Sequence, residues 1–297
     1  MKTNNLISYL YAIAWSVTLL ACSSQPDKQA RRASHTILIG VTQKPTYPDL
    51  IKHAIKPVLE KKGYTVQLLQ LDDQHVFNQT LVDGFVDINI GQHESALNFE
   101  KSNNPKWKIS PLITVPSAHM GIFSDKYPVA TVDELKQAVK PGDIVAMPDD
   151  ATNLPRSLIF LENLGFLKLK DSIDKFAATE HDVAHNPFGL TVKTVKAEQI
   201  PRILDGIAIG VIYGDDADLL GILDRAIIRE VDESDLFLNT FVIQDADRDE
   251  TWVKDFKEAV QSEEFKNVVE NTEYRFHKYY RPSWYREKWG IANEWGK

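Results

Sequence analysis

Apolar and polar stretches alternate in a regular order along the chain after about residue 36. Short apolar runs at 37–41, 66–71 and 86–90 have the length and composition of buried strands. Between them, residues 50–59 and 76–82 carry apolar side chains at helical spacing. This βαβαβ order predicts a parallel sheet with crossover helices, whose ligand crevice lies beyond the carboxyl ends of the strands.

The same rhythm continues through the second half of the chain. Two sets of βα units predict an α/β fold with two lobes that face each other across a cleft. We expect the chain to enter the second lobe near 119–124 and to return near 235–241. The expected domains are 36–120 together with 236–297 for the first lobe, and 121–235 for the second.

The stretch 144–161 predicts a strand, a polar turn and a helix whose first turn contains a proline, which needs no partner for its missing N–H there. The free N–H groups of that turn, together with Arg156, would hold a small anion such as an amino acid carboxylate. The alternative is that Asp150, Thr152 or Asn153 caps the helix and that Arg156 is solvated.

The first 21 residues predict a secretory signal. One early lysine precedes a short apolar core, which ends at Leu19-Leu20-Ala21 before Cys22, the only cysteine of the chain. This pattern resembles a bacterial lipoprotein signal, in which the cysteine becomes the lipidated first residue. Residues 22–35 are then a polar tether, and we expect a membrane-anchored lipoprotein of the cell envelope that faces the periplasm or the exterior. Once Cys22 is lipidated, no thiol remains for disulfides or catalysis.

Charge and motif content narrow the function classes. The net charge of −8, with acidic and basic residues interspersed, argues against a nucleic-acid partner. No Ser-His-Asp spacing, phosphate-binding glycine loop or zinc-binding helix is visible, so we expect no enzyme and no cofactor. Asp149-Asp150, Asp215-Asp216 and His93 could be metal ligands, but an arginine in the same loop would repel a cation, so we expect no metal.

Several motifs, spread over about 37–269, resemble the MetQ/NlpA family of lipoproteins, the methionine-binding components of ABC importers. They are Gly40-Val41-Thr42 with Pro45, residues 56–64, Asp83-Gly84 with Asp87 and Asn89, Gln92-His93, residues 120–124, the loop 148–158, Asn186-Pro187, and Gln199-Ile200-Pro201-Arg202. Together they form a specific signal, although each one alone is weak.

The resemblance implies a type II periplasmic-binding-protein fold, with two α/β lobes that close on a ligand by hinge motion. It also implies that the protein delivers its ligand to an inner-membrane ABC permease, and that Arg156 takes the ligand carboxylate while Asn153 and His93 supply oriented hydrogen bonds. Without the family, His93 would be read as an ordinary strand-end histidine. The further expected ligand contacts are Tyr213, Asp215, Gln74 and Asn239.

The chain departs from the family in its pocket. Gln74, Gly91 and Ala96 stand where the family offers aromatic residues for the methionine thioether, which should enlarge the pocket and weaken methionine binding. Asp215 and Asp216 add negative charge near the expected ammonium position, unless both are solvated at a helix start. We therefore expect a larger or more cationic amino acid, or a short peptide, to suit the site at least as well as methionine.

The last segment, about 276–295, interleaves aromatic and basic residues. We expect it to fold back over a lobe, because Trp and Tyr usually bury their rings. The alternative is a surface for a protein partner. The chain would then be a scaffold lipoprotein that keeps the fold but has lost transport.

Overall fold

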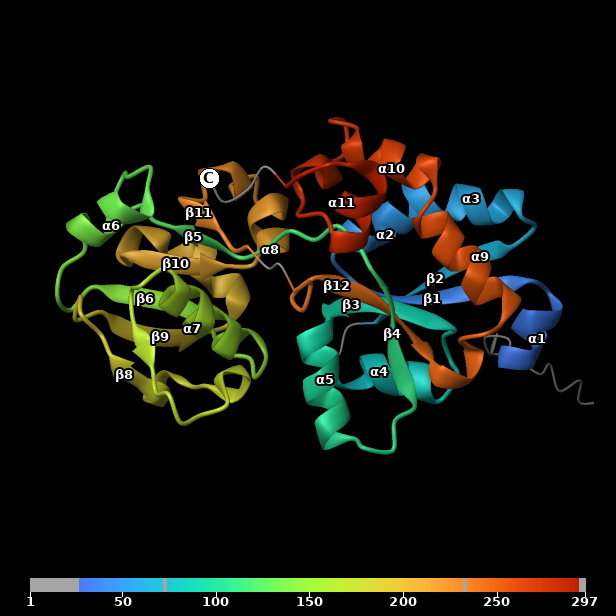
Figure 1. Cartoon of the computed structure of the whole chain (residues 1–297), viewed down its shortest axis with the longest axis horizontal. Coiled ribbons are helices and arrows are strands. Elements are labelled where there is room, and N and C mark those ends of the chain that lie inside the picture. Colours follow the sequence, from blue (N-terminus) through green and yellow to red (C-terminus); the bar gives the residue numbers. More distant parts are fainter. Residues whose placement is uncertain (1–26, 72–73, 232–233, 294–297) are drawn as a thin grey trace, which may run out of the picture.

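The computed structural model describes residues 27–71, 74–231 and 234–293, and for Gln74 and His75 it describes the backbone only. The predicted signal peptide and Cys22 lie outside the described residues. Figure 1 shows two α/β lobes side by side, which confirms the predicted fold class.

Each lobe is built on a five-stranded sheet. The first sheet has the order β2-β1-β3-β12-β4, in which β1 pairs in parallel with β2 and β3, as predicted, while β12 is antiparallel to both its neighbours. Its strands are β1 (Thr36–Thr42), β2 (Thr65–Leu71), β3 (Ile88–His93), β4 (Ile109–Thr114) and β12 (Asn239–Gln244).

The second sheet has the order β11-β5-β10-β6-β9. Its strands are β5 (Gly121–Phe123), β6 (Ile144–Pro148), β9 (Thr191–Val195), β10 (Ile209–Ile212) and β11 (Ile228–Arg229), and a separate ribbon pairs β7 (Lys168–Leu169) with β8 (Val183–His185). The chain therefore changes sheet between Thr114 and Gly121 and again between Arg229 and Asn239. The lobe limits 36–120, 121–235 and 236–297 stay a prediction.

Alternation along β1 explains how the first sheet is covered. Ile37, Ile39 and Val41 face one core with the helices that follow β1 and β12, whereas Leu38 faces the opposite core beneath α4 and α5. Both faces are apolar because a mainly parallel sheet is covered on both sides.

The helices lie on both faces of the two sheets. Around the first sheet they are α2 (Thr46–Leu50), the π-turn η1 (Ile51–Ile55), α3 (Lys56–Lys61), α4 (Gln74–Val82), α5 (Glu94–Asn103), α9 (Thr251–Val260) and α10 (Glu263–Glu270). Around the second sheet they are α6 (Val132–Ala138), α7 (Asn153–Asn163), the 3₁₀ segment η4 (Ala197–Gly206), α8 (Gly214–Leu219) and η5 (Leu223–Arg225). Further short 3₁₀ turns are formed at η2 (Lys175–Ala177), η3 (Glu180–Asp182) and η6 (Asp245–Asp247).

The C-terminal segment folds back, as expected, through η7 (Arg275–Lys278) and α11 (Ser283–Trp289). Phe276, Tyr279 and Tyr285 are almost fully buried against the first lobe. The indole of Trp284 donates to the Thr114 carbonyl at 2.9 Å. These rings therefore belong to the core rather than to an open aromatic surface.

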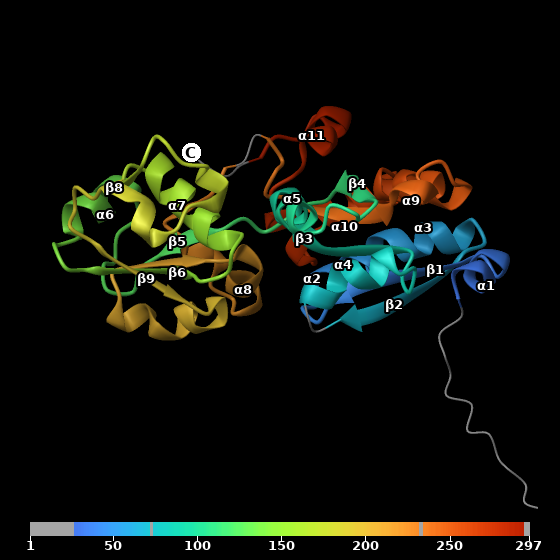
Figure 2. The same ribbon diagram turned by 90° about the horizontal axis from the view of Figure 1, so that it is seen from below.

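The N-terminal segment differs from the expected polar tether. Residues Lys28–Ala33 form helix α1, which both views place at the end of the first lobe farthest from the second (Figures 1 and 2). Arg31 is 1% exposed and its Nε lies 2.8 Å from the fully buried Asp87 carboxylate. The prediction of a solvated tether from residue 22 to residue 35 is therefore wrong from Lys28 onward.

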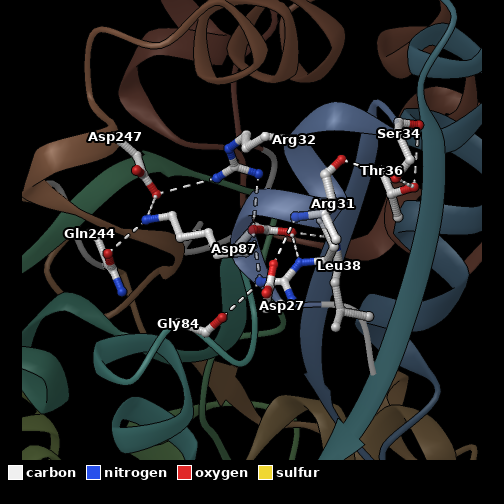
Figure 3. Close-up of polar contacts among 12 residues, drawn as sticks. Asp27, Arg31, Arg32, Ser34, Thr36, Leu38, Gly84, Asp87, Gln244 and Asp247 are labelled. Atoms are coloured by element: carbon white, nitrogen blue, oxygen red, sulfur yellow. Dashed lines mark hydrogen bonds and ion pairs between the residues drawn. The ribbon is translucent and has the colours of Figure 1, made fainter. Parts of the chain in front are cut away.

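Partners distant in sequence explain this difference. Figure 3 shows Arg31 and Arg32 on Asp87, and Arg32 also on Asp247. Lys28 pairs with the same Asp247, at 2.7 Å. Asp87 also accepts the Leu38 backbone N–H at 2.8 Å. The basic residues of this segment are thus neutralised by Asp87 and Asp247, which lie far away in the sequence and could not be identified from the local pattern.

Replacing Arg31 tests this contact. Arg31→Ala should lower the free energy of unfolding by about 3–5 kcal/mol, because Asp87 would stay buried without its main partner. Lys28→Ala, which removes a partly exposed ion pair of the same helix, should cost about 0–1 kcal/mol. Urea unfolding measures both, and equal effects of the two variants would contradict the buried role of Arg31.

Candidate ligand-binding site

A cavity of about 380 Å³ opens between the two lobes, beyond the carboxyl ends of β1 and β3. This volume lies in the range of small-molecule sites. The first lobe contributes Lys44, Tyr47 and His93 to the wall, and the second contributes Asn153 and Arg156. The predicted crevice and the predicted loop therefore meet at one place.

Arg156 is buried, with only 6% of its surface exposed, and it is paired with a carboxylate that the sequence did not suggest. Its Nε lies 2.9 Å from Oε2 of Glu230, and its Nη2 contacts the same oxygen at 2.5 Å. The guanidinium also stacks over the Phe237 ring, with Cζ 4.7 Å from the ring centroid. The alternative of a solvated arginine is excluded.

This pairing determines what Arg156 can offer a ligand. Two of its nitrogens are occupied by Glu230, and Nη1 makes no hydrogen bond to a described residue. Since Glu230 already balances its charge, Arg156 can present a directed N–H donor to the cavity more readily than a free positive charge.

The helix N-terminus that was expected to hold an anion is already capped. Asp150 accepts hydrogen bonds from the backbone N–H groups of Thr152 and Asn153, at 3.2 and 2.9 Å. The N–H of Leu154 bonds to the Asp150 carbonyl, and Pro155 has none. The expectation of free amide hydrogens there is therefore wrong: the anion at this helix terminus is Asp150 itself.

His93 joins the two lobes across the cavity. Its Nδ1 accepts the Ala96 N–H at 3.0 Å, capping α5, so the proton resides on Nε2, which faces Asn153 Oδ1 at 3.3 Å. Burial and the nearby Arg156 guanidinium lower the pKa of His93 to about 3. His93 is therefore a neutral, oriented donor at physiological pH.

The other predicted contacts include two that lie on the cavity wall and one that has no described side chain. Tyr213 and Asn239 both line the cavity. The Tyr213 hydroxyl donates to Asp150, which leaves only its oxygen lone pair and its ring for a ligand. Burial alone would raise the pKa of Asp150, but the hydrogen bonds from Tyr213 and Asn153 hold it below its usual value. Gln74 begins α4, and its side chain lies outside the described residues.

The positions that lack the family's aromatic residues do not all leave empty space. Gly91 and Ala96 line the cavity, together with the Phe77 ring. A Cβ on Gly91 would lie 2.5 Å from Cγ2 of Thr42 and 3.1 Å from Cζ of Phe77. The expectation that Gly91 enlarges the pocket is therefore wrong, because neighbouring side chains fill that space.

Asp215 lines the cavity from α8 and is half-buried. Its Oδ1 is buried and makes no hydrogen bond to a described residue. Burial raises its pKa to about 6, the positive charge of Lys44 opposes the shift, and Asp216 and Asp218 add to it. The Lys44 ammonium forms its ion pair with Asp216, at 2.5 Å, and not with Asp215.

Sequence reasoning missed three residues of this site. Glu230 lies in the segment that returns to the first lobe, Phe237 packs behind Arg156 and His93, and Tyr47 sits in the first turn of α2. Only the expected position of the return crossing could have pointed to Glu230. In the described part of the chain no three His, Cys, Asp or Glu side chains gather into a metal site.

Two α/β lobes joined by two crossings, with a polar cavity between them, define a two-lobe solute-binding protein. The comparisons then give the family. A model of the NlpA lipoprotein family matches residues 37–284, and the chain belongs to this family. The match extends beyond residue 269, where the range of the motifs quoted from the sequence ends, and includes part of the C-terminal segment.

Individual relatives agree with this assignment. The D-methionine-binding lipoprotein MetQ of Yersinia pestis is 30% identical over 270 residues, which cover 87% of this chain and 91% of the relative. That of Escherichia coli K12 is 30% identical over 256 residues, covering 85% and 89%. The methionine-bound structure of a nutrient binding protein from Burkholderia cenocepacia has a TM-score of 0.69 at 27% identity, covering 79% of this chain and 95% of the other.

Asp215, which is half-buried and has a buried Oδ1, predicts a pH dependence of stability without ligand. An acid whose pKa is about 6 when folded and 3.8 in the unfolded reference binds its proton more tightly in the folded state. Asp215 therefore weakens the fold by about 3 kcal/mol as pH rises from about 4 to about 7. Asp215→Asn removes this loss, so the stability of the variant minus that of the wild type should grow by about 3 kcal/mol over the same range.

Urea unfolding at several pH values measures this difference. Asp133→Asn, at a side chain that is 88% exposed, is the matched control and should show a nearly constant difference. A constant difference for Asp215→Asn as well would contradict the burial of its charge.

Proposed function

We propose that the chain is a lipid-anchored receptor that captures an amino acid, or a short peptide, and delivers it to an ABC permease of the inner membrane. The observation that carries the proposal is the interlobe cavity, on whose wall Arg156 and Asn153 from one lobe meet His93 from the other. Relatives named as methionine-binding lipoproteins support an amino-acid-like ligand. Binding is reversible, and the ligand is not chemically converted.

The anchor in this proposal is a lipid on Cys22, which would hold the protein at the cell envelope. Within the described ranges, no helix has the length and apolar character to cross a membrane. The buried aromatic rings of the C-terminal segment remove the surface on which the scaffold alternative relied. The receptor is therefore the function that we retain.

Ligand recognition rests on directed hydrogen bonds in this proposal. Nη1 of Arg156 takes one oxygen of the ligand carboxylate, and the neutral His93 holds Asn153 in place. Because Glu230 balances the guanidinium, replacing Arg156 alone would leave a buried carboxylate unpaired and would damage the fold as well as the site. A useful test must remove both members of the pair.

The carboxylate assignment can be tested from the side of the ligand. Methionine and lysine should bind the wild-type protein about 2–5 kcal/mol more tightly than their primary amides, which lack the carboxylate. In the double variant Arg156→Met/Glu230→Leu, which leaves no unpaired buried charge, this preference should vanish. Titration calorimetry measures the affinities, and a thermal shift without ligand checks folding.

Two outcomes would count against the proposal. A full preference for the free acid in the double variant would remove Arg156 from the carboxylate site. If none of the twenty amino acids, nor any of a set of dipeptides, stabilises the wild-type protein at millimolar concentration, the receptor function itself is wrong, since a ligand at 100 times its dissociation constant adds about 2.7 kcal/mol.

A further inference from the structure

The charges on the cavity wall do not balance. Within the part of the chain that the structure describes, the charged residues lining the cavity are Lys44, Arg156, Glu100 and Asp215. Both cations are already paired with carboxylates that are not part of the lining, Lys44 with Asp216 and Arg156 with Glu230. Neither Glu100 nor Asp215 has an ion-pair partner among the described residues. The unmatched charge of the site is therefore negative.

The polar groups in the corner around Asp215 lack hydrogen-bond partners, and its carboxylate lacks a counter-charge, among the described residues. Its buried Oδ1, the hydroxyl of Tyr47 and the hydroxyl of Thr46 all lack a hydrogen bond within the described residues. Tyr47 and Thr46 are 2% and 0% exposed, so solvent does not serve them from outside. An ionised carboxylate can only accept hydrogen bonds, whereas each hydroxyl can donate one and can also accept one from a ligand.

An ammonium group meets this need. It carries three donors and a positive charge, and buried polar groups in folded proteins are almost always hydrogen-bonded. A ligand carboxylate in this corner would place two like charges side by side, and an apolar side chain would leave the charge of Asp215 without a counter-charge. The charge and the unpaired polar groups of this corner therefore complement a cationic nitrogen.

Glu100 extends the argument to a second cation. It lies on α5 of the first lobe and lines the cavity, whereas Asp215 lies on α8 of the second. A ligand with one cationic nitrogen could neutralise only one of these carboxylates. A ligand with two could neutralise both and would attract both lobes to itself.

We propose that the preferred ligand is an amino acid or short peptide with two cationic nitrogens, one bound at Asp215 with Tyr47 and Thr46, and the other facing Glu100. This inference rests on the proposed receptor function and specifies its ligand class. Asp215 and Glu100 are then the residues that determine specificity, and a neutral thioether side chain is the weaker ligand.

The experiment compares lysine with norleucine, which has the same carbon chain but no terminal ammonium. Titration calorimetry should show that the wild-type protein binds lysine at least tenfold more tightly than norleucine. Asp215→Asn and Glu100→Gln should each weaken lysine binding at least tenfold. The control Asp133→Asn, which removes the same charge at an exposed site of the second lobe, should leave both affinities within twofold.

The outcomes separate this inference from the function on which it rests. If norleucine or methionine binds the wild-type protein as tightly as lysine, the dicationic ligand class is wrong while the receptor function stands. If only one of the two cavity variants weakens lysine binding, the assignment of two carboxylates is wrong. If lysine, norleucine and methionine all fail to bind, both the inference and the receptor function are overturned for amino acids of this size.

Discussion

The buried ion pair between Arg156 and Glu230 is the interaction on which the site depends. Arg156 comes from the first turn of α7, and Glu230 lies in the segment that returns to the first lobe. The carbonyl of Glu230 accepts the Nδ1 proton of His119, and its N–H donates to the Met120 carbonyl, so both crossings are tied to the same carboxylate residue. Removing one member of such a pair is costly because the other stays buried without compensation. The guanidinium is therefore fixed between the lobes and is electrically balanced.

This balance changes how the cavity attracts a ligand. A site in which an unpaired arginine and a helix N-terminus face the ligand favours a negatively charged ligand group. Here Glu230 neutralises the arginine, Asp150 caps the helix and Asp216 holds Lys44. The same fold can thus form a cavity that favours a cationic ligand over an anionic one, because each positive group on its wall is already paired with a carboxylate of the protein.

Both ends of the described chain are fixed on the first lobe. Helix α1 is held by Arg31 on Asp87, which directly precedes β3, the strand that ends at His93. The C-terminal segment bridges to the second lobe, where Asp218 accepts hydrogen bonds from Arg275 and Tyr279 at 3.1 and 2.8 Å. Since Asp218 shares α8 with Asp215, the C-terminal segment also supports one wall of the cavity.

The sequence by itself determined the two-lobe α/β fold, most of the order of strands and helices, and the loop that carries Arg156. These features follow from apolar periodicity and turn residues, which are local signals and can be recognised in the linear sequence. Gathering His93, Asn153 and Arg156 at one cavity also agreed with the expectation from the family resemblance.

Only the tertiary structure decided which charged residues form ion pairs with each other. Glu230 is 74 residues from Arg156, and Asp87 is 56 residues from Arg31, so no local pattern links them. The same limit applies to Asp215 of the second lobe, whose pKa is influenced by burial and by Lys44 of the first. Composition shows how many charges a chain has, whereas the energy of each charge depends on its desolvation and its neighbours, which exist only after folding.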